Sequence, residues 1–589
     1  MCLGVGASNE RDAQLHSRAM LIVGLKLSHD GAVAAVEDGR LLFSIEAEKI
    51  DNRKRYASLG HLHEIDAMLT REGIERADVD AFVVDGWFDR DSDDLTKCVS
   101  IPIETTAGRR FIRVGPYHER IGDDVGKRYV FRSVEIDVAG GGSYASYSHV
   151  AGHVFSTYCT SPFAVRGERA LVIVWDGAIF PRLYGVDPAA RAVTSMGPLF
   201  PVGGSLFGHF SSCLPLFAAI EAGGDELGVA GKAMAYAGLG QSRPDVVDLL
   251  REEVPQLKPV RMDDAQVLVK LLVGNAHSSA TDADLIASLQ DYLGSELVSS
   301  LQDRFDRDSR VRGYENLCLS GGCALNIKWN SRIRASGLAR EVWVPPFPND
   351  SGSALGMACA EMVSQTGNWL LDWEVFRGPS LDVTGSVDGW SERPCRPEEL
   401  GRLLHTTGEA LVVLKGRAEL GPRALGHRSI LAPAIRPEMK DFLNEIKGRE
   451  GYRPVAPICR EDDAPALFAP GLPDPYMLFD HQMRAAWQER IPAVLHLDGT
   501  ARLQTVSPST AAFAWQVLSA YREASGIPVL CNTSANFKGR GFFPSAASAM
   551  EWGRVDRVWA DGRLYEARGS KPKAMSIVSS TGSLPVRAR

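Results

Sequence analysis

Two stretches of the sequence, about 150 residues apart, share the same order of apolar runs and turns. "LIVGLKLSHDGAVAAVEDGRLLFSIEAEK" (21–49) and "ALVIVWDGAIFPRLYGVDPAARAVTSM" (170–196) each contain three apolar, β-branched runs, and both carry Asp-Gly-Ala in the first turn. Such runs, bounded by Gly and Asp, predict β-strands. A strand-rich unit that recurs in one chain predicts two related α/β halves.

Two later segments continue the α/β pattern. "NLCLSGGCALNIKWNSRI" (316–333) predicts a buried strand, a glycine turn and a helix, and "EVWVPPFPNDSGSALGMACAEMV" (341–363) predicts a strand, an Asp-containing turn and a helix. The doubled strand–turn–strand unit with a later Gly-Gly turn is typical of actin-like nucleotide-binding folds, where backbone N–H groups hold phosphates. Gly321 and Gly322 are therefore candidate nucleotide-binding residues, although close packing alone also requires glycine at such turns.

A second α/β region follows a stretch rich in Gly, Pro, Ser and Trp. Residues 409–416 predict a strand, residues 437–449 an amphipathic helix, and "IPVLCNTSAN" a strand that runs into a polar loop. Ser507-Pro508 and Gly526 bracket another helix with ordinary start and stop signals. We therefore divide the chain into a first domain (20–365), a linker (366–398), a second domain (399–568) and a disordered tail (569–589).

A pair of histidines is spaced for a shared ligand. His149 and His153 are four residues apart, which on a helix puts their side chains about 5–6 Å apart on one face. The apolar residues of the segment fall on the opposite arc, so we do not expect core histidines. The pair either binds one metal ion or is simply solvated. Asp350, between a strand and a helix, is either a helix N-cap, the commoner role there, or a third ligand.

Positive charge is concentrated in the second domain. Residues 415–460 contain ten Lys or Arg and five Asp or Glu, a net charge of +5 in a chain of net charge −8. Several of these bases stand beside Gly or Pro, which a merely solvated helix face does not need. Arginine binds phosphate oxygens in a bidentate manner, so we favour a pocket for a phosphate-rich ligand. Arg502 and the loop Asn532-Thr533-Ser534 are candidates to complete it.

Composition and charge argue against several other classes. The 589 residues are 45% hydrophobic and 23% charged, as in ordinary globular proteins. A pI of about 6.0 argues against a general nucleic-acid-binding protein, and no apolar run approaches the ~20 residues of a membrane span. The ten cysteines form no CxxC motif, which indicates reduced thiols and a cytoplasmic protein. The first 19 residues lack a signal-peptide core, so translation begins at either Met1 or Met20.

Eight motifs occur in the order in which one protein family has them: "HDGAVAAVEDGR", "SHVAGH", "LSGGCALN", "NDSGSALG", "ELGPRALGHRSIL", "NEIKGREGYRPVAP", "DGTARLQTV" and "NTSAN". The chain thereby resembles the O-carbamoyltransferases of antibiotic and nodulation-factor biosynthesis, from about residue 20 to 568. That family joins a two-lobed TsaD-like domain of the actin-like (ASKHA) α/β fold to a smaller α/β YrdC-like domain. The resemblance implies the same architecture here.

The resemblance implies two coupled reactions. The YrdC-like domain would make carbamoyl-adenylate from carbamoyl phosphate and ATP, with Mg²⁺ accompanying ATP. The TsaD-like domain would transfer the carbamoyl group to a hydroxyl of a natural product. It would use a metal ion, Fe²⁺ or another divalent transition metal, which acts as a Lewis acid on the carbamoyl carbonyl. The expected partners are small molecules, without nucleic acid or membrane, and a homodimer is left open.

Specific residues take roles under this resemblance. The metal ligands would be His149, His153 and Asp350. Nucleotide and carbamoyl-adenylate would bind at Lys232, Gly321, Gly322 and Asn326. Carbamoyl phosphate and ATP would bind at Lys415, Arg423, Arg428, Lys447, Arg453, Arg502, Asn532 and Ser534.

The first hairpin tip supplies candidates for the catalytic base. An alcohol is a poor nucleophile until a base takes its proton. The His29-Asp30-Gly31 turn points into the cleft in this fold, so we expect His29 or Asp30 to act on the acceptor hydroxyl. Asp30 is equally well explained as a residue that only caps the turn. Asp176, in the second Asp-Gly-Ala turn, is the next candidate.

The chain departs from the family pattern in places. "EAEKIDNRKRY" has Tyr56 where His is common, and "NTSAN" replaces the commoner "NTSFN". These changes concern the choice of acceptor more than the reaction class, and the sequence does not identify the acceptor. Two alternatives stay open: a tRNA-modifying enzyme of the threonylcarbamoyl type and a non-catalytic ATP-binding regulator. The acidic charge argues against the first and the retained histidine and arginine motifs against the second.

Overall fold

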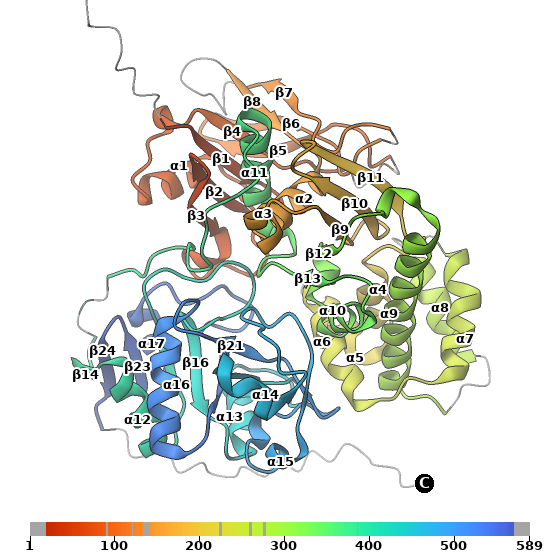
Figure 1. Ribbon diagram of the computed structural model, residues 1–589. Helices are drawn as coiled ribbons and strands as arrows, with labels where there is room; N and C mark the ends of the chain where they lie inside the picture. Colours follow the sequence, from red (N-terminus) through yellow and green to blue (C-terminus); the bar gives the residue numbers. More distant parts are fainter. Residues whose placement is uncertain are drawn as a thin grey trace, which may run out of the picture.

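The computed structural model describes residues 19–89, 92, 94–120, 122–133, 142–222, 226–257, 262–274, 279–383, 385 and 387–569 (Figure 1). The tail predicted after residue 568 lies, apart from Gly569, outside these residues. The described chain forms two sheets and a helical region in its first part and a larger sheet in its second part.

The first sheet has six strands in the order β3-β2-β1-β4-β8-β7. They are β1 (Leu21–Lys26), β2 (Ala32–Glu37), β3 (Arg40–Glu46), β4 (Ala81–Val84), β7 (Tyr129–Arg132) and β8 (Ser143–Ser146). β1, β2 and β3 are antiparallel, whereas β4 and β8 run parallel to β1. Helix α1 (Leu62–Arg71) precedes β4, and β5 (Val99–Thr105) and β6 (Gly108–Val114) form a separate hairpin.

The second sheet repeats this topology in the order β11-β10-β9-β12-β13. Its strands are β9 (Ala170–Val174), β10 (Arg182–Asp187), β11 (Ala192–Pro198), β12 (Asn316–Ser320) and β13 (Glu341–Trp343). Each sheet begins with three antiparallel strands and adds parallel strands beside the first of them. This duplication is the arrangement of the actin-like (ASKHA) fold and confirms the predicted α/β halves.

Two helices lie between the sheets and bring them together (Figure 1). They are α2 (His149–Cys159) and α11 (Ser353–Thr366). α11 packs on β1 and β2, α2 packs on β9 and β12, and the two helices contact each other. At their crossing a Cβ on Gly356 would lie only 1.9 Å from the carbonyl oxygen of Gly152, so position 356 requires glycine. The shared core of the two halves surrounds this crossing.

A helical region covers the outer face of the second sheet (Figure 1). Its helices are α4 (Leu206–Ser212), α5 (Pro215–Ala222), α6 (Glu226–Tyr236), α7 (Pro244–Glu253), α8 (Met262–Gly274), α9 (Asp282–Arg307) and α10 (Ile327–Ser336). The short helix α3 (Pro162–Arg166) follows α2.

The second domain is built on an eight-stranded mixed sheet in the order β14-β24-β23-β15-β16-β22-β17-β21. Its strands are β14 (Trp390–Pro394), β15 (Leu411–Leu414), β16 (Arg428–Pro433), β17 (Ala456–Arg460), β21 (Gln504–Val506), β22 (Val529–Ser534), β23 (Arg557–Ala560) and β24 (Arg563–Ala567). β14 comes from the segment expected to be a linker, and it pairs with β24 at the edge of the sheet.

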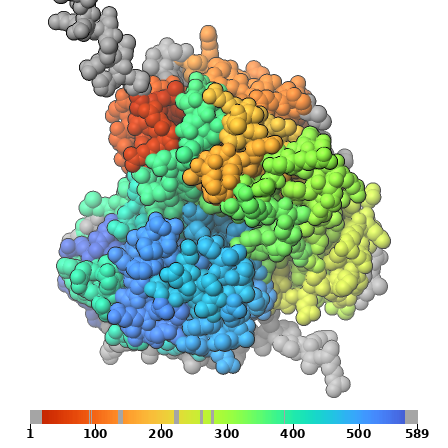
Figure 2. Space-filling view, in the orientation of Figure 1, coloured from red at the N-terminus to blue at the C-terminus, as the bar shows by residue number. Residues whose placement is uncertain are grey.

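Helices cover both faces of this sheet. They are α12 (Pro397–Thr407), α13 (Glu438–Ile446), α14 (Ala464–Leu467), α15 (Ala485–Gln488), α16 (Ala512–Ser525) and α17 (Ala546–Trp552). Leu411 and Val413 face α12 and α16, whereas Val412 and Leu414 face α13 and α17, as alternation along a strand requires. A small sheet of β18 (Phe468–Ala469), β19 (His481–Met483) and β20 (Thr500–Ala501) completes the domain. The space-filling view shows the two domains in close contact (Figure 2).

Candidate functional site

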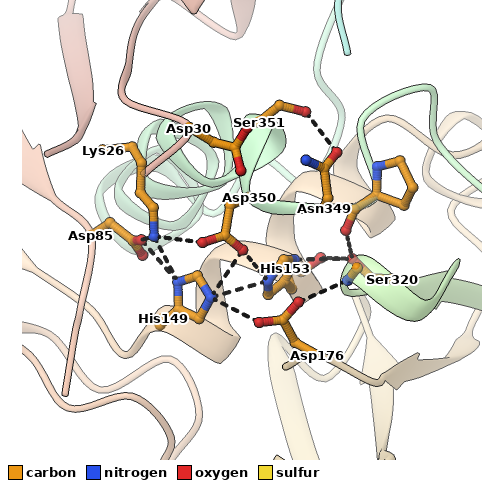
Figure 3. A network of polar contacts seen from close by, with 12 residues as sticks. Lys26, Asp30, Asp85, His149, His153, Asp176, Ser320, Asn349, Asp350 and Ser351 are labelled. Carbon is orange, nitrogen blue, oxygen red and sulfur yellow. Dashed lines mark hydrogen bonds and ion pairs between the residues drawn. The ribbon is translucent and has the colours of Figure 1, made fainter. Parts of the chain in front are cut away.

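Four buried side chains converge between the two halves of the first domain (Figure 3). They are His149, His153, Asp176 and Asp350, and each presents one ligand atom within 4.8 Å of the others. His149 Nε2 lies 3.2 Å from His153 Nε2 and 3.4 Å from Asp350 Oδ1. Asp350 Oδ1 lies 3.5 Å from His153 Nε2, and Asp176 Oδ2 lies 3.7 Å from His149 Nε2.

These separations fit one metal ion. Ligand atoms that bind a transition metal at about 2.0–2.2 Å are roughly 3.0–3.5 Å apart from one another. Two imidazoles with carboxylate oxygens are a donor set that suits divalent transition metals. The cluster can therefore hold a metal ion, as predicted for His149, His153 and Asp350, and Asp176 joins them as a fourth candidate ligand.

A second layer of side chains orients the histidines. The Nδ1–H group of His149 donates to Asp85 Oδ2 at 2.8 Å, which leaves Nε2 free to face the cluster. On the other histidine, Nδ1 of His153 lies 3.4 Å from Ser320 Oγ. Buried Lys26 contacts Asp85 Oδ2 and Asp350 Oδ2, each at 2.8 Å.

The charges of this layer balance one another. Burial alone would lower the pKa of Lys26, but the carboxylates of Asp350 and Asp85 outweigh it and raise this pKa. Burial likewise opposes ionisation of Asp350, yet the positive charge of Lys26 and the contact with His149 hold the pKa of Asp350 well below its ordinary range. Asp350 is thus a carboxylate, the form in which it can bind a metal.

The sequence explains why these groups meet. Ser148 begins α2 by accepting a hydrogen bond from Ala151 N, so His149 stands in the first turn. Gly152 lies between the two histidines and allows α11 to approach α2 closely. Asp350 opens the short helix η7 (Asp350–Gly352) directly before α11. The crossing of the two helices therefore sets the distance between the histidines and the carboxylate.

Two expectations about these residues were wrong. His149 and His153 were expected to lie outside the core, but every residue of α2 is buried, because the second sheet and α11 pack against it. Position alone favoured Asp350 as a helix N-cap, but its side chain caps no helix and points to Lys26 and the histidines. The solvated and capping interpretations are therefore excluded.

The predicted base candidates lie at the edge of the cluster. His29 Nε2 is 3.6 Å from Asp350 Oδ2, and His29 Nδ1 is 3.1 Å from Asp30 Oδ2. Asp176 is buried and accepts hydrogen bonds from Tyr117 OH at 2.5 Å and from Gly322 N at 2.7 Å. Burial and the Asp350 carboxylate oppose its ionisation, but the contacts with His149 and His153 keep the pKa of Asp176 below its ordinary value.

A cavity of about 900 Å³ opens beside these groups. Its wall includes His29, Trp87, Phe88 and residues of the β5–β6 hairpin. The Trp87 ring connects the cavity with the buried cluster, because it lies 4.0 Å from Lys26 Nζ and contacts His29 edge to face. His29, whose side chain is 32% exposed, is thus shared by the cavity and the cluster.

A second cluster, of basic residues, lies in the second domain. We name Arg423, Arg449, Arg453 and Arg502 the basic pocket. Burial, together with the neighbouring positive charges, lowers the pKa of Arg423 to about 10 and that of Arg449 to about 9. Burial and the other three arginines hold the pKa of Arg502 well below its ordinary value.

The basic pocket has donors to spare. Within the described part of the chain, the Nε atoms of Arg423 and Arg502 are buried and have no hydrogen-bond partner. Arg453 pairs with Glu450 at 3.9 Å, and Arg449 donates to Thr533 Oγ1 at 3.1 Å and to Ser534 Oγ at 3.5 Å. Concentrated positive charge with unused donors is suited to an anionic ligand.

Several predicted phosphate-binding residues have other partners. Arg428 is buried and donates to the carbonyl oxygens of Lys415 and Gly416. Lys415 itself is half exposed and lies 3.4 Å from Asp561 Oδ1. These contacts give both residues structural partners, and their predicted phosphate-binding roles stay predictions.

Lys447 and Asn532 also act as supports. Lys447 Nζ donates to the carbonyl oxygens of Ser534 at 2.5 Å and of Asn536 at 2.9 Å, and to the Asn536 side chain. Asn532 Nδ2 donates to Ala424 O at 3.0 Å, next to Arg423. Both residues therefore hold the loops of the basic pocket in place, and their predicted contacts with phosphate stay predictions.

The predicted nucleotide-binding residues are placed as follows. Asn326 caps α10, because its side chain accepts hydrogen bonds from the backbone of Lys328 and Trp329. Gly321 has a φ of +87°, and a Cβ there would lie 2.3 Å from a carbonyl oxygen of Trp175, so close packing accounts for this glycine.

Two other members of that set stay predictions. Gly322 N already donates to Asp176 Oδ1, which links the Gly-Gly turn to the His/Asp cluster. Lys232 lies on α6, whose last residue, Tyr236, contacts Tyr452 of the second domain with ring centroids 5.3 Å apart.

Sequence reasoning missed three residues around the His/Asp cluster of His149, His153, Asp176 and Asp350. Lys26 is a single lysine in the apolar run "LIVGLKL", Asp85 follows the apolar run "AFVV", and Tyr117 lies outside any recognised motif. A charged residue inside or at the end of a buried strand needs a partner, so the first two carried a signal. Tyr117 carried none.

Comparisons with known proteins identify the family to which the chain belongs. A sequence model described as the carbamoyltransferase N-terminus matches residues 21–359, and one described as the carbamoyltransferase C-terminus matches residues 403–560. None of the helices in the described ranges is long and apolar enough to cross a membrane.

Relatives align over nearly the whole chain. Nodulation protein U of Sinorhizobium fredii (strain NBRC 101917 / NGR234) is 46% identical over 94% of this chain and 100% of its own length. The 3'-hydroxymethylcephem-O-carbamoyltransferase of Streptomyces clavuligerus is 32% identical over 94% of this chain and 100% of its own length. Among solved structures, the activator of 2-hydroxyisocaproyl-CoA dehydratase from Clostridium difficile is 14% identical, with a TM-score of 0.32, over 59% of this chain and 97% of its own. Because both parts of the family are matched, the chain belongs to the carbamoyltransferase family and is an O-carbamoyltransferase.

Proposed function

We propose that the chain carries out two reactions in two places. The second domain, as a YrdC-like unit, makes carbamoyl-adenylate from carbamoyl phosphate and ATP, with Mg²⁺ accompanying ATP. The first domain, as a TsaD-like unit, transfers the carbamoyl group to a hydroxyl of a small natural product. The observation that carries this proposal is that one carbamoyltransferase chain holds two chemically different clusters, the basic pocket and the His/Asp cluster.

The first reaction concerns phosphate chemistry. Carbamoyl phosphate, ATP and one water give carbamoyl-adenylate, phosphate and pyrophosphate, so both substrates and both leaving groups are polyanions. Arg423, Arg449, Arg453 and Arg502 bind these anions and stabilise the charge that develops on the leaving groups. Ser534, whose hydroxyl lies 3.5 Å from Arg449, supplies a further polar contact.

The second reaction moves the carbamoyl group from the adenylate to an alcohol. The alcohol oxygen forms a bond with the carbamoyl carbon, the bond to the phosphate oxygen of AMP breaks, and the alcohol proton leaves. His29 lies where the cavity meets the cluster, so it takes this proton, while Asp30 holds its Nδ1. His149, His153, Asp350 and Asp176 would hold Fe²⁺ or another divalent transition metal, which supplies Lewis acidity toward the carbamoyl carbonyl.

The cavity beside His29 is the proposed place of the acceptor. Trp87 and Phe88 offer apolar ring surface, and Ser28 and Ser58 offer hydroxyls that can hold an oxygen-rich molecule. The Streptomyces clavuligerus relative is named for a hydroxymethyl acceptor. A homodimer stays a prediction. The identity of the acceptor stays an open question.

The two half-reactions should separate by mutation. Carbamoyl-phosphate-dependent release of pyrophosphate from ATP reports the first, and a mass-spectrometric screen of hydroxylated acceptors for a carbamate product reports the second. Arg423→Ala or Arg502→Ala should reduce pyrophosphate release by roughly 100-fold or more, whereas His149→Ala should preserve it and stop transfer.

Arg436→Ala is the matched control, because Arg436 belongs to the same basic stretch but is exposed and donates to Gly408 O at 2.8 Å. It should leave both reactions unchanged. If His149→Ala blocks pyrophosphate release as strongly as Arg423→Ala does, the assignment of the two reactions to two places is wrong.

A further inference from the structure

The segment that follows β3 belongs to the first domain but lies against the second. Lys49 is buried, and its Nζ donates to Glu46 Oε1 at 2.8 Å and to the carbonyl oxygens of Glu419 at 2.8 Å and Gly421 at 2.7 Å. Gly421 N in turn donates to Glu46 Oε1 at 3.0 Å. This buried ion pair of the first domain therefore holds the loop that carries Arg423.

The same segment then pairs with a second loop of the other domain. Arg55 N donates to Gly539 O at 2.9 Å, and Gly541 N donates to Arg53 O at 3.0 Å. A Cβ on Gly541 would lie 1.7 Å from Glu48 O, so the two backbones touch. This second loop continues from β22, whose last residue is Ser534.

Arg55 is thus anchored between the two loops that border the basic pocket. Burial is the largest cause of the lowered pKa of Arg423 and of Arg449. The positive charge of Arg55 lowers both pKa values further, as do the neighbouring arginines, so Arg55 acts on the pocket. The Arg55 guanidinium also lies over the Tyr56 ring, 4.9 Å from its centroid, which restricts its orientation.

Adding a cation to an existing cluster of cations costs free energy in the absence of an anion. A domain contact by itself does not need such a charge, because the backbone pairing and the Lys49 ion pair already join the two domains. A bound polyphosphate reverses the sign of the effect, because each further cation then stabilises the complex.

We propose that Arg55 of the first domain is a phosphate-binding residue of the basic pocket in the second domain. This inference rests on the proposed function, in which that pocket binds carbamoyl phosphate and ATP. It adds that the pocket is complete only when the first domain is in contact with the second. Formation of carbamoyl-adenylate then depends on a residue of the domain that carries out transfer.

The test measures pyrophosphate binding to the full chain by isothermal titration calorimetry. Arg55→Met and Arg55→Gln should weaken binding roughly 10- to 100-fold, the range for loss of one charge-assisted contact. Arg55→Lys, which keeps the charge, should recover most of the affinity. Lys54→Met is the matched control, because it removes the same charge from the preceding, exposed residue, and it should change affinity less than about threefold.

Arg423→Met separates this inference from the proposed function. If Arg423→Met weakens pyrophosphate binding while both Arg55→Met and Arg55→Gln bind like the wild type, Arg55 is not part of the pocket and the inference is overturned alone. If Arg423→Met also binds like the wild type, the pocket is not the phosphate site and both proposals fall. Thermal unfolding of each variant verifies that affinity is compared between folded proteins, and Arg55→Gln serves if Arg55→Met is unstable.

Discussion

Gly356→Ala tests whether the crossing of α2 and α11 sets the distances within the His/Asp cluster. An added Cβ at this position would lie 1.9 Å from Gly152 O, whereas Cβ atoms in proteins do not approach other heavy atoms closer than about 3.0 Å. α2 and α11 must therefore separate by about 1.1 Å where they cross. Overpacking of this kind costs about 1–3 kcal/mol of folding free energy.

The separation acts directly on the proposed ligands. His149 and His153 lie on α2, one on each side of Gly152, and Asp350 lies just before α11. Metal–ligand distances tolerate deviations of about 0.2 Å, so a displacement of about 1 Å is too large to absorb. We expect the purified variant to lose most of its bound metal and its transfer activity, and to unfold a few degrees lower, while it still releases pyrophosphate.

Metal analysis by mass spectrometry, thermal unfolding and the two half-reaction assays verify this expectation. Gly231→Ala is the control, because it also replaces a helical glycine but its Cβ would have no atom within 4 Å. It should retain the metal and, as a helix substitution, gain about 0.5–1 kcal/mol. Full metal content with an unchanged unfolding temperature in Gly356→Ala would refute the argument that the helix crossing sets the ligand distances.

Three further predictions concern the same cluster. The double variant His149→Ala plus His153→Ala should contain no bound transition metal by mass spectrometry, whereas exposed His405→Ala should contain as much as wild type; equal content in both would contradict the ligand assignment. His29→Asn should lower the rate of carbamoyl transfer about 10²- to 10⁴-fold with pyrophosphate release preserved, and an unchanged rate would move the role of base to Asp176. Lys26→Met should lower the free energy of unfolding by roughly 3–5 kcal/mol in denaturant titration, because it leaves two buried carboxylates without their cation; a loss below about 1 kcal/mol would show that they are neutral.

The strands and turns of the fold were predictable because their signals are local. The Asp-Gly-Ala turns after β1 and β9, and Gly526 after α16, stand where short-range geometry requires them. The histidine pair was likewise found from its spacing alone. Its burial was not predictable, because the histidines give α2 the polar face that usually indicates exposure to solvent. In the structure this face lies against the carboxylates of the cluster, and the whole helix is buried.

The basic stretch shows the limit of composition. Arg423 and Arg428 are five residues apart in "GPRALGHRS", yet one has an unused buried donor and the other binds carbonyl oxygens inside the sheet. Residue type and local sequence do not distinguish them, because the difference lies in the tertiary contacts that each side chain makes. Arg55 was invisible for another reason, since more than 360 residues separate it from the pocket it adjoins.

The pairing of β14 with β24 bears on how such a chain can be assembled from parts. The second domain is entered and left through neighbouring strands at one edge of its sheet, so its two ends meet. Domains whose ends meet can be inserted into or removed from another chain without rerouting the backbone. The course of the backbone would thus allow the second domain to be moved as a unit into another chain. Under our proposal for Arg55, however, a copy moved to a new host would bring its fold intact and leave one of its phosphate contacts behind.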